Sequence, residues 1–157
     1  MWEALEEMGW VQTMGSTGWM YSTISVTHYV AMFWFIGSIA MVDLRVMGLA
    51  ARKRNIGELA QMLFPWAWIG FALSTAAGFL MFATAAGDWA PSKHFHIKLA
   101  LIAVSVVFAV IVQASATKWS ESSETPTVAK IIALISLALW IATIVSASEI
   151  PALEGLG

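Results

Sequence analysis

Three histidines, His28, His94 and His96, are the side chains of this sequence best suited to metal coordination or proton transfer. Imidazole is the commonest metal ligand in proteins, and it exchanges protons near neutral pH. The sequence has no cysteine, so thiolate metal sites, disulfides and cysteine nucleophiles are excluded. It also has no glycine-rich phosphate loop and no recognisable serine-hydrolase motif. Metal, haem or proton chemistry at the histidines is therefore the first hypothesis.

The elements that must position these histidines are membrane-spanning helices. Of 157 residues, 59% are hydrophobic and 11% are charged, whereas about a quarter of a soluble domain is charged. A helix that crosses the bilayer core needs roughly 20 apolar residues. Such stretches occupy residues 22–42, 61–85, 96–116 and 127–147, with short polar connections between them. The sequence therefore predicts an all-α protein, an up-down bundle of four transmembrane helices that forms one membrane domain over residues 1–157.

The first 21 residues precede the first predicted span and differ from it in composition. Trp2, Leu5, Met8 and Trp10 recur at nearly helical spacing, and acidic residues lie between them. The segment has no basic residue, which a cleavable signal peptide would need. We expect a short amphipathic helix that lies in the headgroup zone, where tryptophan is favoured.

Basic residues indicate how the bundle is oriented. Loops that carry an excess of Lys and Arg face the cytoplasm. The first and third connections are flanked by six of the eight basic residues, namely Arg45, Arg52, Lys53, Arg54, Lys118 and Lys130. We therefore expect a multi-pass protein of a bacterial inner membrane with both termini periplasmic. The basic residues form no clustered face, so a nucleic-acid partner is not expected.

Two of the histidines are predicted to lie at one depth in the membrane. His28 lies six residues into the first span, and His96 lies four residues after Ser92, the expected cap of the third span. At 1.5 Å per residue, their depths differ by only ~3 Å. Imidazoles from two helices can hold a haem iron from both faces. We therefore expect b-type haem between the first and third spans, near the periplasmic face, with His28 and His96 as iron ligands.

The rest of the third span divides into two faces. Ala100 and Ala103 lie below His96, and their small side chains would leave room for a flat macrocycle, while Lys93 would meet its propionates. Lys98 lies on the opposite face, which it shares with His94, and would extend to the headgroups or to a neighbouring subunit of a homo-oligomer. His94 is a further hypothesis as ligand of a second metal, since the two histidines of 94–96 resemble a weak copper motif.

Three further features have simpler interpretations. Gly70, Ser74 and Gly78 recur every four residues, a pattern typical of closely packed membrane helices. Asp43, at the inner end of the first span, is expected to pair with a nearby arginine. Trp140 lies deep in the fourth span, where it would either line a pocket or face lipid.

Part of the sequence resembles known membrane proteins. The first span, from His28-Tyr29-Val30 to Gly37, is similar to the opening helix of the HemJ-like and CopD-like families, and His96-Ile97-Lys98-Leu99 resembles a His-x-Lys-Leu motif of the HemJ-like proteins. HemJ-like proteins are four-helix protoporphyrinogen oxidases that bind haem b. The resemblance implies functional roles for His28, His96 and Lys98. The resemblance to the CopD-like proteins implies copper handling.

Two other segments, 43–49 and 64–71, resemble an uncharacterised bacterial family of four-helix inner-membrane proteins. The chain lacks the basic and aromatic stretch, ending in histidine, that follows the first span of HemJ-like proteins. Haem binding with electron transfer, with quinone as the expected redox partner, is therefore the main hypothesis. A haem-dependent oxidoreductase such as a porphyrinogen oxidase, and a copper-handling protein, are the alternatives.

Overall fold

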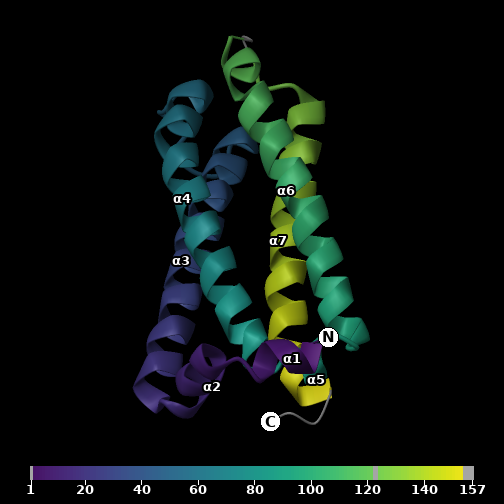
Figure 1. The fold of residues 1–157 in the computed structure, drawn as a ribbon. Coiled ribbons are helices and arrows are strands. Elements are labelled where there is room, and N and C mark those ends of the chain that lie inside the picture. The colour runs from purple at the N-terminus through teal and green to yellow at the C-terminus, as the bar shows by residue number, and fades with distance from the viewer. Residues whose placement is uncertain (1, 122–123, 154–157) are drawn as a thin grey trace.

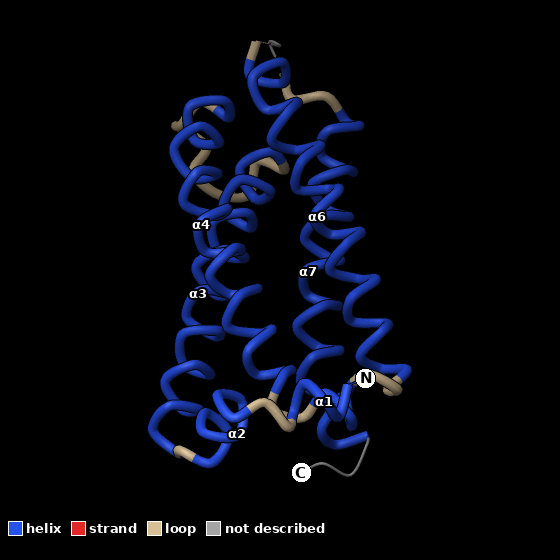
Figure 2. Tube along the Cα trace, in the orientation of Figure 1, coloured by secondary structure: helices blue, strands red, loops and turns tan. Residues whose placement is uncertain are grey.

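The chain folds entirely into helices over the residues that the computed structural model describes, 2–121 and 124–153, of which residue 3 and 148–153 are described without their side chains. The elements are α1 (Trp2–Glu6), α2 (Gly9–Ser16), α3 (Gly18–Val46), α4 (Ile56–Ala83), α5 (Ala86–Trp89), α6 (Lys93–Ser120) and α7 (Thr127–Leu153). Non-helical segments are confined to the two ends of the bundle (Figure 2). No strand occurs in this part of the chain.

Four of the helices, α3, α4, α6 and α7, are long and apolar enough to cross a membrane, which confirms the predicted fold class. Most of them extend beyond the predicted spans because polar end residues continue the helix outside its apolar part. Asn55 caps α4 by accepting hydrogen bonds from the amides of Gly57 and Glu58. Ser92 caps α6 by accepting from the amide of Phe95, as expected. These caps satisfy amides that the first turn of a helix leaves unpaired.

The four long helices form a ring in which each packs on two neighbours (Figure 1). Helix α3 packs most extensively on α4, and α6 on α7, while α4–α6 and α3–α7 contacts close the ring. Helices α3 and α6 are therefore diagonal. The expectation that the first and third spans enclose a cofactor as neighbours is wrong, because short connections place consecutive helices side by side and alternate helices across the bundle.

Small residues bring α3 and α4 together, as the four-residue spacing predicts. A Cβ atom added at Gly70 would lie 3.0 Å from the carbonyl oxygen of Ala31. One turn further along, the Ser74 hydroxyl donates to the carbonyl oxygen of His28 over 3.2 Å. Gly78 lies against the His28 ring itself. The stripe therefore packs the helices and also sets the position of His28.

The two ends of the bundle differ. At one, the terminal end, the short helices α1, α2 and α5 lie across the openings between the long helices (Figure 1). The amino-terminal amphipathic segment thus forms two helices, and the Glu6 carboxylate ties α1 to α5 by accepting a hydrogen bond of 2.6 Å from the Gly87 amide. At the other, the basic end, lie the loop 47–55 and the described part of the connection between α6 and α7, residues 121 and 124–126.

The hydrophobic core is concentrated in the half of the bundle toward the basic end. Phe35, Ile39 and Val42 of α3 are buried there against residues of α4, α6 and α7, such as Phe64 and Val112. Toward the terminal end the helices are less closely packed and leave a cavity.

Candidate functional site

A cavity of about 440 Å³ lies among α3, α4, α6 and α7 in the terminal half of the bundle. This volume is in the range of roughly 300–1,000 Å³ that small-molecule and cofactor sites occupy. Its walls are mainly aromatic: Trp2, Phe35, Phe71, Phe79, Phe82, Phe95 and Trp140. Its ionisable groups are His28 and Lys98, and its hydroxyls belong to Ser74, Thr75 and Thr143. An apolar chamber with a few converging polar groups is the usual form of a ligand site.

The His28 ring is held in a defined orientation by α4. Its Nδ1 atom lies 2.8 Å from the carbonyl oxygen of Ser74 and 3.2 Å from the Ser74 hydroxyl. A carbonyl oxygen only accepts, so Nδ1 carries the hydrogen and, in the neutral ring, the Nε2 lone pair is available. Histidines that ligate metals are commonly fixed in this way, because the Nδ1 hydrogen bond sets both tautomer and ring direction.

Gly78 leaves the space that the His28 ring occupies. A Cβ atom at position 78 would lie 3.0 Å from Cε1 and 3.1 Å from Nδ1 of His28, closer than nine in ten real Cβ contacts. The imidazole would then have to shift by a few tenths of an ångström from its position against the Ser74 carbonyl. Gly78 is thus a requirement of the ring orientation as well as of helix packing.

Replacing Gly78 with alanine should therefore destabilise the protein and displace His28. Overpacking of a close contact typically costs about 1–3 kcal/mol, which exceeds the ~1 kcal/mol that Gly→Ala gains within a helix. Gly37→Ala in α3 is the matched control, because an added Cβ there meets no atom within 4 Å. Thermal unfolding in detergent should show a lower midpoint for Gly78→Ala and an unchanged or higher one for Gly37→Ala. Equal midpoints would show that the His28 ring does not need this space.

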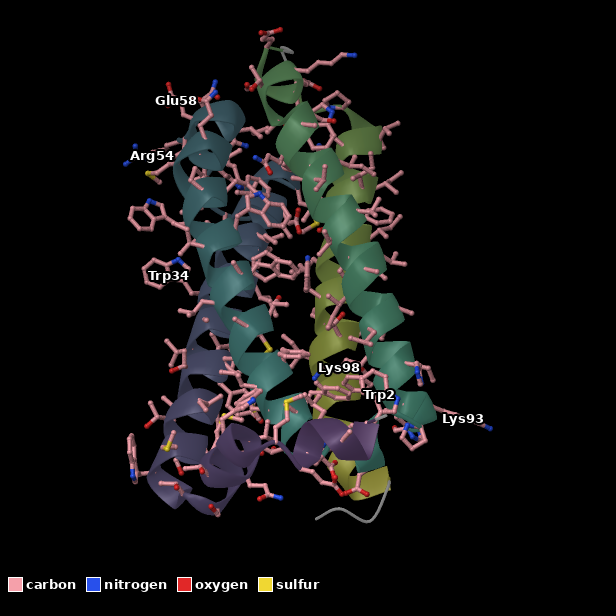
Figure 3. The ribbon with its side chains drawn as sticks, viewed as in Figure 1. Trp2, Trp34, Arg54, Glu58, Lys93 and Lys98 are labelled. Carbon is pink, nitrogen blue, oxygen red and sulfur yellow. The ribbon has the colours of Figure 1, made fainter. Side chains whose placement is uncertain are left out.

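Lys98 enters the cavity from α6, on the side opposite α3. Figure 3 shows its side chain directed inward, whereas Lys93 extends away from the bundle, and Trp2 lines the same cavity. Trp2 packs edge-on against Phe82, with ring centroids 5.6 Å apart, and so covers the terminal side of the cavity. Lys98 has no ion pair or hydrogen bond with any residue whose side chain is described. Its amine is therefore placed to pair with an acidic group of whatever the cavity binds.

Four other residues expected at the cofactor, His96, Lys93, Ala100 and Ala103, do not line this cavity. All four are exposed on the outer surface of α6, and Nδ1 of His96 lies 2.7 Å from the carbonyl oxygen of Ser92 on its own first turn. The expected pairing of His28 and His96 across one cavity is wrong. The physical reason is helix rotation: successive residues turn by about 100°, so Lys98 faces inward when His96 faces out. The same rotation overturns the idea that Lys98 meets a neighbouring subunit.

His94 is half-buried at the start of α6. Among the residues that the structure describes, no group of three or more histidine and acidic side chains is placed to hold a metal ion. Copper binding by His94 and His96 with Asp88 therefore finds no support in this part of the chain, and copper binding with a methionine as third ligand stays a prediction.

Several residues of the cavity could not be identified from the sequence. Phe79, Phe82 and Phe95 look like ordinary residues of apolar spans, and only the packing of four helices brings them together. Trp140 was expected either to line a pocket or to face lipid, and it is buried against Phe35 with ring centroids 4.8 Å apart. Trp34, which is equally deep, points out of the bundle (Figure 3).

The site belongs to a class defined by its architecture: a four-helix membrane bundle that encloses an aromatic chamber with one oriented imidazole and one lysine. No protein-family model, curated protein or solved structure matches the chain. Its chemistry must therefore be inferred from the geometry of the chamber.

Proposed function

We propose that this protein binds b-type haem in the aromatic cavity, with His28 as the iron ligand and Lys98 as the partner of a haem carboxylate. The observation that supports this most strongly is the His28 ring, which is fixed through Nδ1 so that Nε2 is free to ligate at the cavity. The proposal keeps the haem hypothesis drawn from the sequence and replaces His96 by Lys98 as the second recognition residue.

The groups that line the cavity suit a planar, largely apolar molecule with acidic substituents. Aromatic side chains from all four long helices and from α1 favour burial of a flat conjugated ring. One neutral imidazole provides the ligand that haem iron most often takes in proteins. The Lys98 ammonium, which has no described counter-charge, would be stabilised by a carboxylate. A purely apolar ligand such as a lipid chain would leave this cation unpaired.

When bound, haem supplies a one-electron couple at its iron. The residues of the chain would bind and orient it: the Ser74 carbonyl fixes the His28 tautomer, and Gly78 admits the ring. Phe82 and Trp2 exclude water from the terminal side. Among the described residues that line the cavity, His28 is the one histidine, and Met32 is a second side chain of a type that can hold haem iron. We propose a membrane quinone as redox partner, because a lipid-soluble carrier can reach a site between membrane helices.

An optical spectrum tests the proposal directly. The protein would be expressed with a haem precursor, purified in detergent and measured as a reduced-minus-oxidised difference. We expect a Soret band and close to one haem per chain. A colourless preparation that also fails to take up added haem would refute haem binding.

A second candidate function, porphyrinogen oxidation, is favoured by one specific observation. His28 and Lys98, two of the three residues to which the HemJ-like resemblance assigns importance, line the same cavity, whereas His96 does not. A tetrapyrrole substrate carries carboxylates that Lys98 would pair with, as haem does. Complementation of a bacterial strain without protoporphyrinogen oxidase distinguishes the two functions. Growth would indicate the enzyme, whereas a haem spectrum without growth would indicate a haem-binding protein.

We also propose that the terminal end faces the periplasm of a bacterial inner membrane. Because the chain has no native cysteine, one introduced thiol reports its own location. Asp88→Cys lies at the terminal end and Glu58→Cys at the basic end, and both positions are exposed. In intact spheroplasts, a membrane-impermeant maleimide should label the Asp88→Cys thiol at least about tenfold faster than the Glu58→Cys thiol. The reverse pattern would invert the orientation, and equal labelling after lysis is the control.

A further inference from the structure

A second polar cluster lies deeper in the bundle, in the closely packed half toward the basic end. Asp43 of α3 has no exposed surface, and neither of its carboxyl oxygens has a hydrogen-bond partner among the described residues. The expected pairing with an arginine is wrong, because Arg45 Nε donates instead to the carbonyl oxygen of Arg54 over 2.6 Å. Arg52 Nε likewise donates to the Gly48 carbonyl. The nearby arginines thus close the α3–α4 loop and leave Asp43 alone.

Two further unsatisfied polar atoms lie on α7, the helix that packs against α3. Within the described chain, they are the hydroxyl of Ser136 and the indole Nε1 of Trp140. The two residues are four apart and therefore share one face of α7. Ser136 lies beside Asp43, and Trp140 lines the aromatic cavity. Buried polar groups are nearly always hydrogen-bonded, so unpaired carboxyl oxygens beside an unpaired hydroxyl indicate a proton or a cation bound between them.

Among the residues whose side chains the structure describes, no charged group of the surrounding helices compensates Asp43. The buried residues of α4 and α6 include no titratable side chain. On α7 the residues buried in the bundle are Ala129, Ala133, Ser136, Trp140 and Thr143, which are also uncharged. Lys130 of α7 and Glu58 of α4, toward the same end, are exposed. The carboxyl must therefore be neutralised by something other than a described side chain.

The occupant is a proton rather than a metal cation. An ionised carboxylate without a partner is very costly in an apolar interior, and it takes up a proton instead. A cation such as Na⁺ would need several oxygen ligands, and here the Trp140 N–H can only donate, so it would oppose a positive charge. A protonated carboxyl can donate to the Ser136 hydroxyl and still accept from a donor such as the indole N–H. The donors and acceptors of the cluster then match.

We propose that Asp43, with Ser136 and Trp140, forms a buried proton-binding site at the boundary of the aromatic cavity. When the proton is released, the Asp43 O–H bond breaks, the proton passes to a water molecule, and the Ser136 hydroxyl donates to the carboxylate that is left; the reverse step restores the acid. Trp140 belongs to both the cluster and the cavity wall, so the two sites share a boundary. The proposal goes beyond haem binding and does not depend on it.

Dicyclohexylcarbodiimide tests the site, because this apolar reagent partitions into membranes and reacts with protonated carboxyls. The acid proton moves to a carbodiimide nitrogen, the carboxyl oxygen adds to the central carbon, and rearrangement gives a stable acylurea. Purified protein in detergent would be labelled at neutral pH and mapped by peptide mass spectrometry. We expect Asp43 to be labelled at least about tenfold more than Glu58 and Asp88, whose side chains are exposed to solvent. Labelling at Asp43 should fall as the pH is raised.

The controls separate the proton from other occupants. Asp43→Asn should abolish that adduct and leave the others unchanged, and Ser136→Ala, which keeps the carboxyl, should retain it. Labelling at Asp43 no greater than at Glu58 would overturn the proposal, since the carboxyl would then be ionised. Protection by Na⁺ at constant pH would also overturn it, in favour of a cation site. The labelling can be measured on protein with or without haem. A failure of haem binding would therefore not be confused with a failure of this site.

Discussion

Replacing His28 with alanine should yield a folded protein that has lost its haem spectrum. Among the described residues, His28 supplies the only imidazole that lines the aromatic cavity. Without it, the cavity offers no histidine ligand to the iron. Loss of a residue that merely orients a metal ligand typically costs 10–100-fold in affinity. Loss of the ligand itself should cost more than about 100-fold, which would remove the Soret band from the purified protein.

The matched control is His96→Ala, which makes the same chemical change on the outer surface of α6. We expect its difference spectrum and haem content to equal those of the unmodified protein. His28→Ala should still fold, because it loses the ring's hydrogen bonds with Ser74, at about 0.5–1.5 kcal/mol each, and its contacts with Gly78 and Tyr29, while the rest of the bundle is unchanged. If His96→Ala removed the band and His28→Ala retained it, the ligand assignment would be wrong.

A milder change distinguishes a ligand from a packing residue. Ser74→Ala removes the hydroxyl that contacts His28 but retains the carbonyl oxygen that holds Nδ1. The affinity for haem should therefore fall by no more than about tenfold, which is the low end of what an orienting residue contributes. The contrast between Ser74→Ala and His28→Ala then reports on Nε2, the atom proposed to meet the iron.

The fold could be predicted because each membrane helix is determined by a continuous run of apolar residues in the sequence. An apolar run of about 20 residues must form a helix in the bilayer, since unpaired backbone groups are too costly there. Four such runs with short connections then fix the up-down order. Ser92 could be recognised as the cap of α6 for a similar reason, since the cap of a helix depends on adjacent residues.

The depth of His28 could be predicted from the sequence, but the side of α6 that faces the interior could not. Counting residues places His28 in the terminal half of α3, as the structure has it. Rotation about a helix axis is set by packing with distant segments, and a membrane helix that is apolar on all sides gives little indication of it. The sequence therefore could not show that Lys98, rather than His96, faces the interior.

The helices that pack against α3 were also predicted wrongly from the sequence. Adjacency of the first and third spans was assumed from the equal depth of their histidines, although an up-down order makes those spans diagonal. The stripe of Gly70, Ser74 and Gly78 was recognised as a packing surface, and its partner, the His28 face of α3, became known only from the structure. The prediction for Asp43 is wrong for a related reason, because arginines that are close in sequence suggested an ion pair. In the structure the Asp43 carboxyl is directed toward α7, whereas the arginine guanidinium groups are directed toward the loop.

Lys98 provides the second large expected effect, because it is the only basic side chain lining the cavity that a haem carboxylate can meet. Lys98→Met preserves the length and apolar stem of the side chain and removes its charge. A hydrogen bond to a charged group contributes about 1.5–3 kcal/mol, so haem affinity should fall roughly 10–150-fold. Titration of the purified apoprotein with haem, followed at the Soret band, measures this change. Lys93→Met, on the exposed start of α6, should leave the affinity unchanged.

Haem dimethyl ester shows whether Lys98 acts through the carboxylate. Esterification removes the negative charges and leaves the ring and iron intact, so the unmodified protein should bind the ester more weakly than haem. Lys98→Met should bind the two forms with nearly equal affinity, because the charge that distinguishes them is gone. This double comparison isolates the lysine–carboxylate contact from general effects of the substitution. If Lys98→Met discriminated between haem and ester as strongly as the unmodified protein does, the carboxylate would lie elsewhere, and Lys98 would have to be assigned to the iron or to a different ligand.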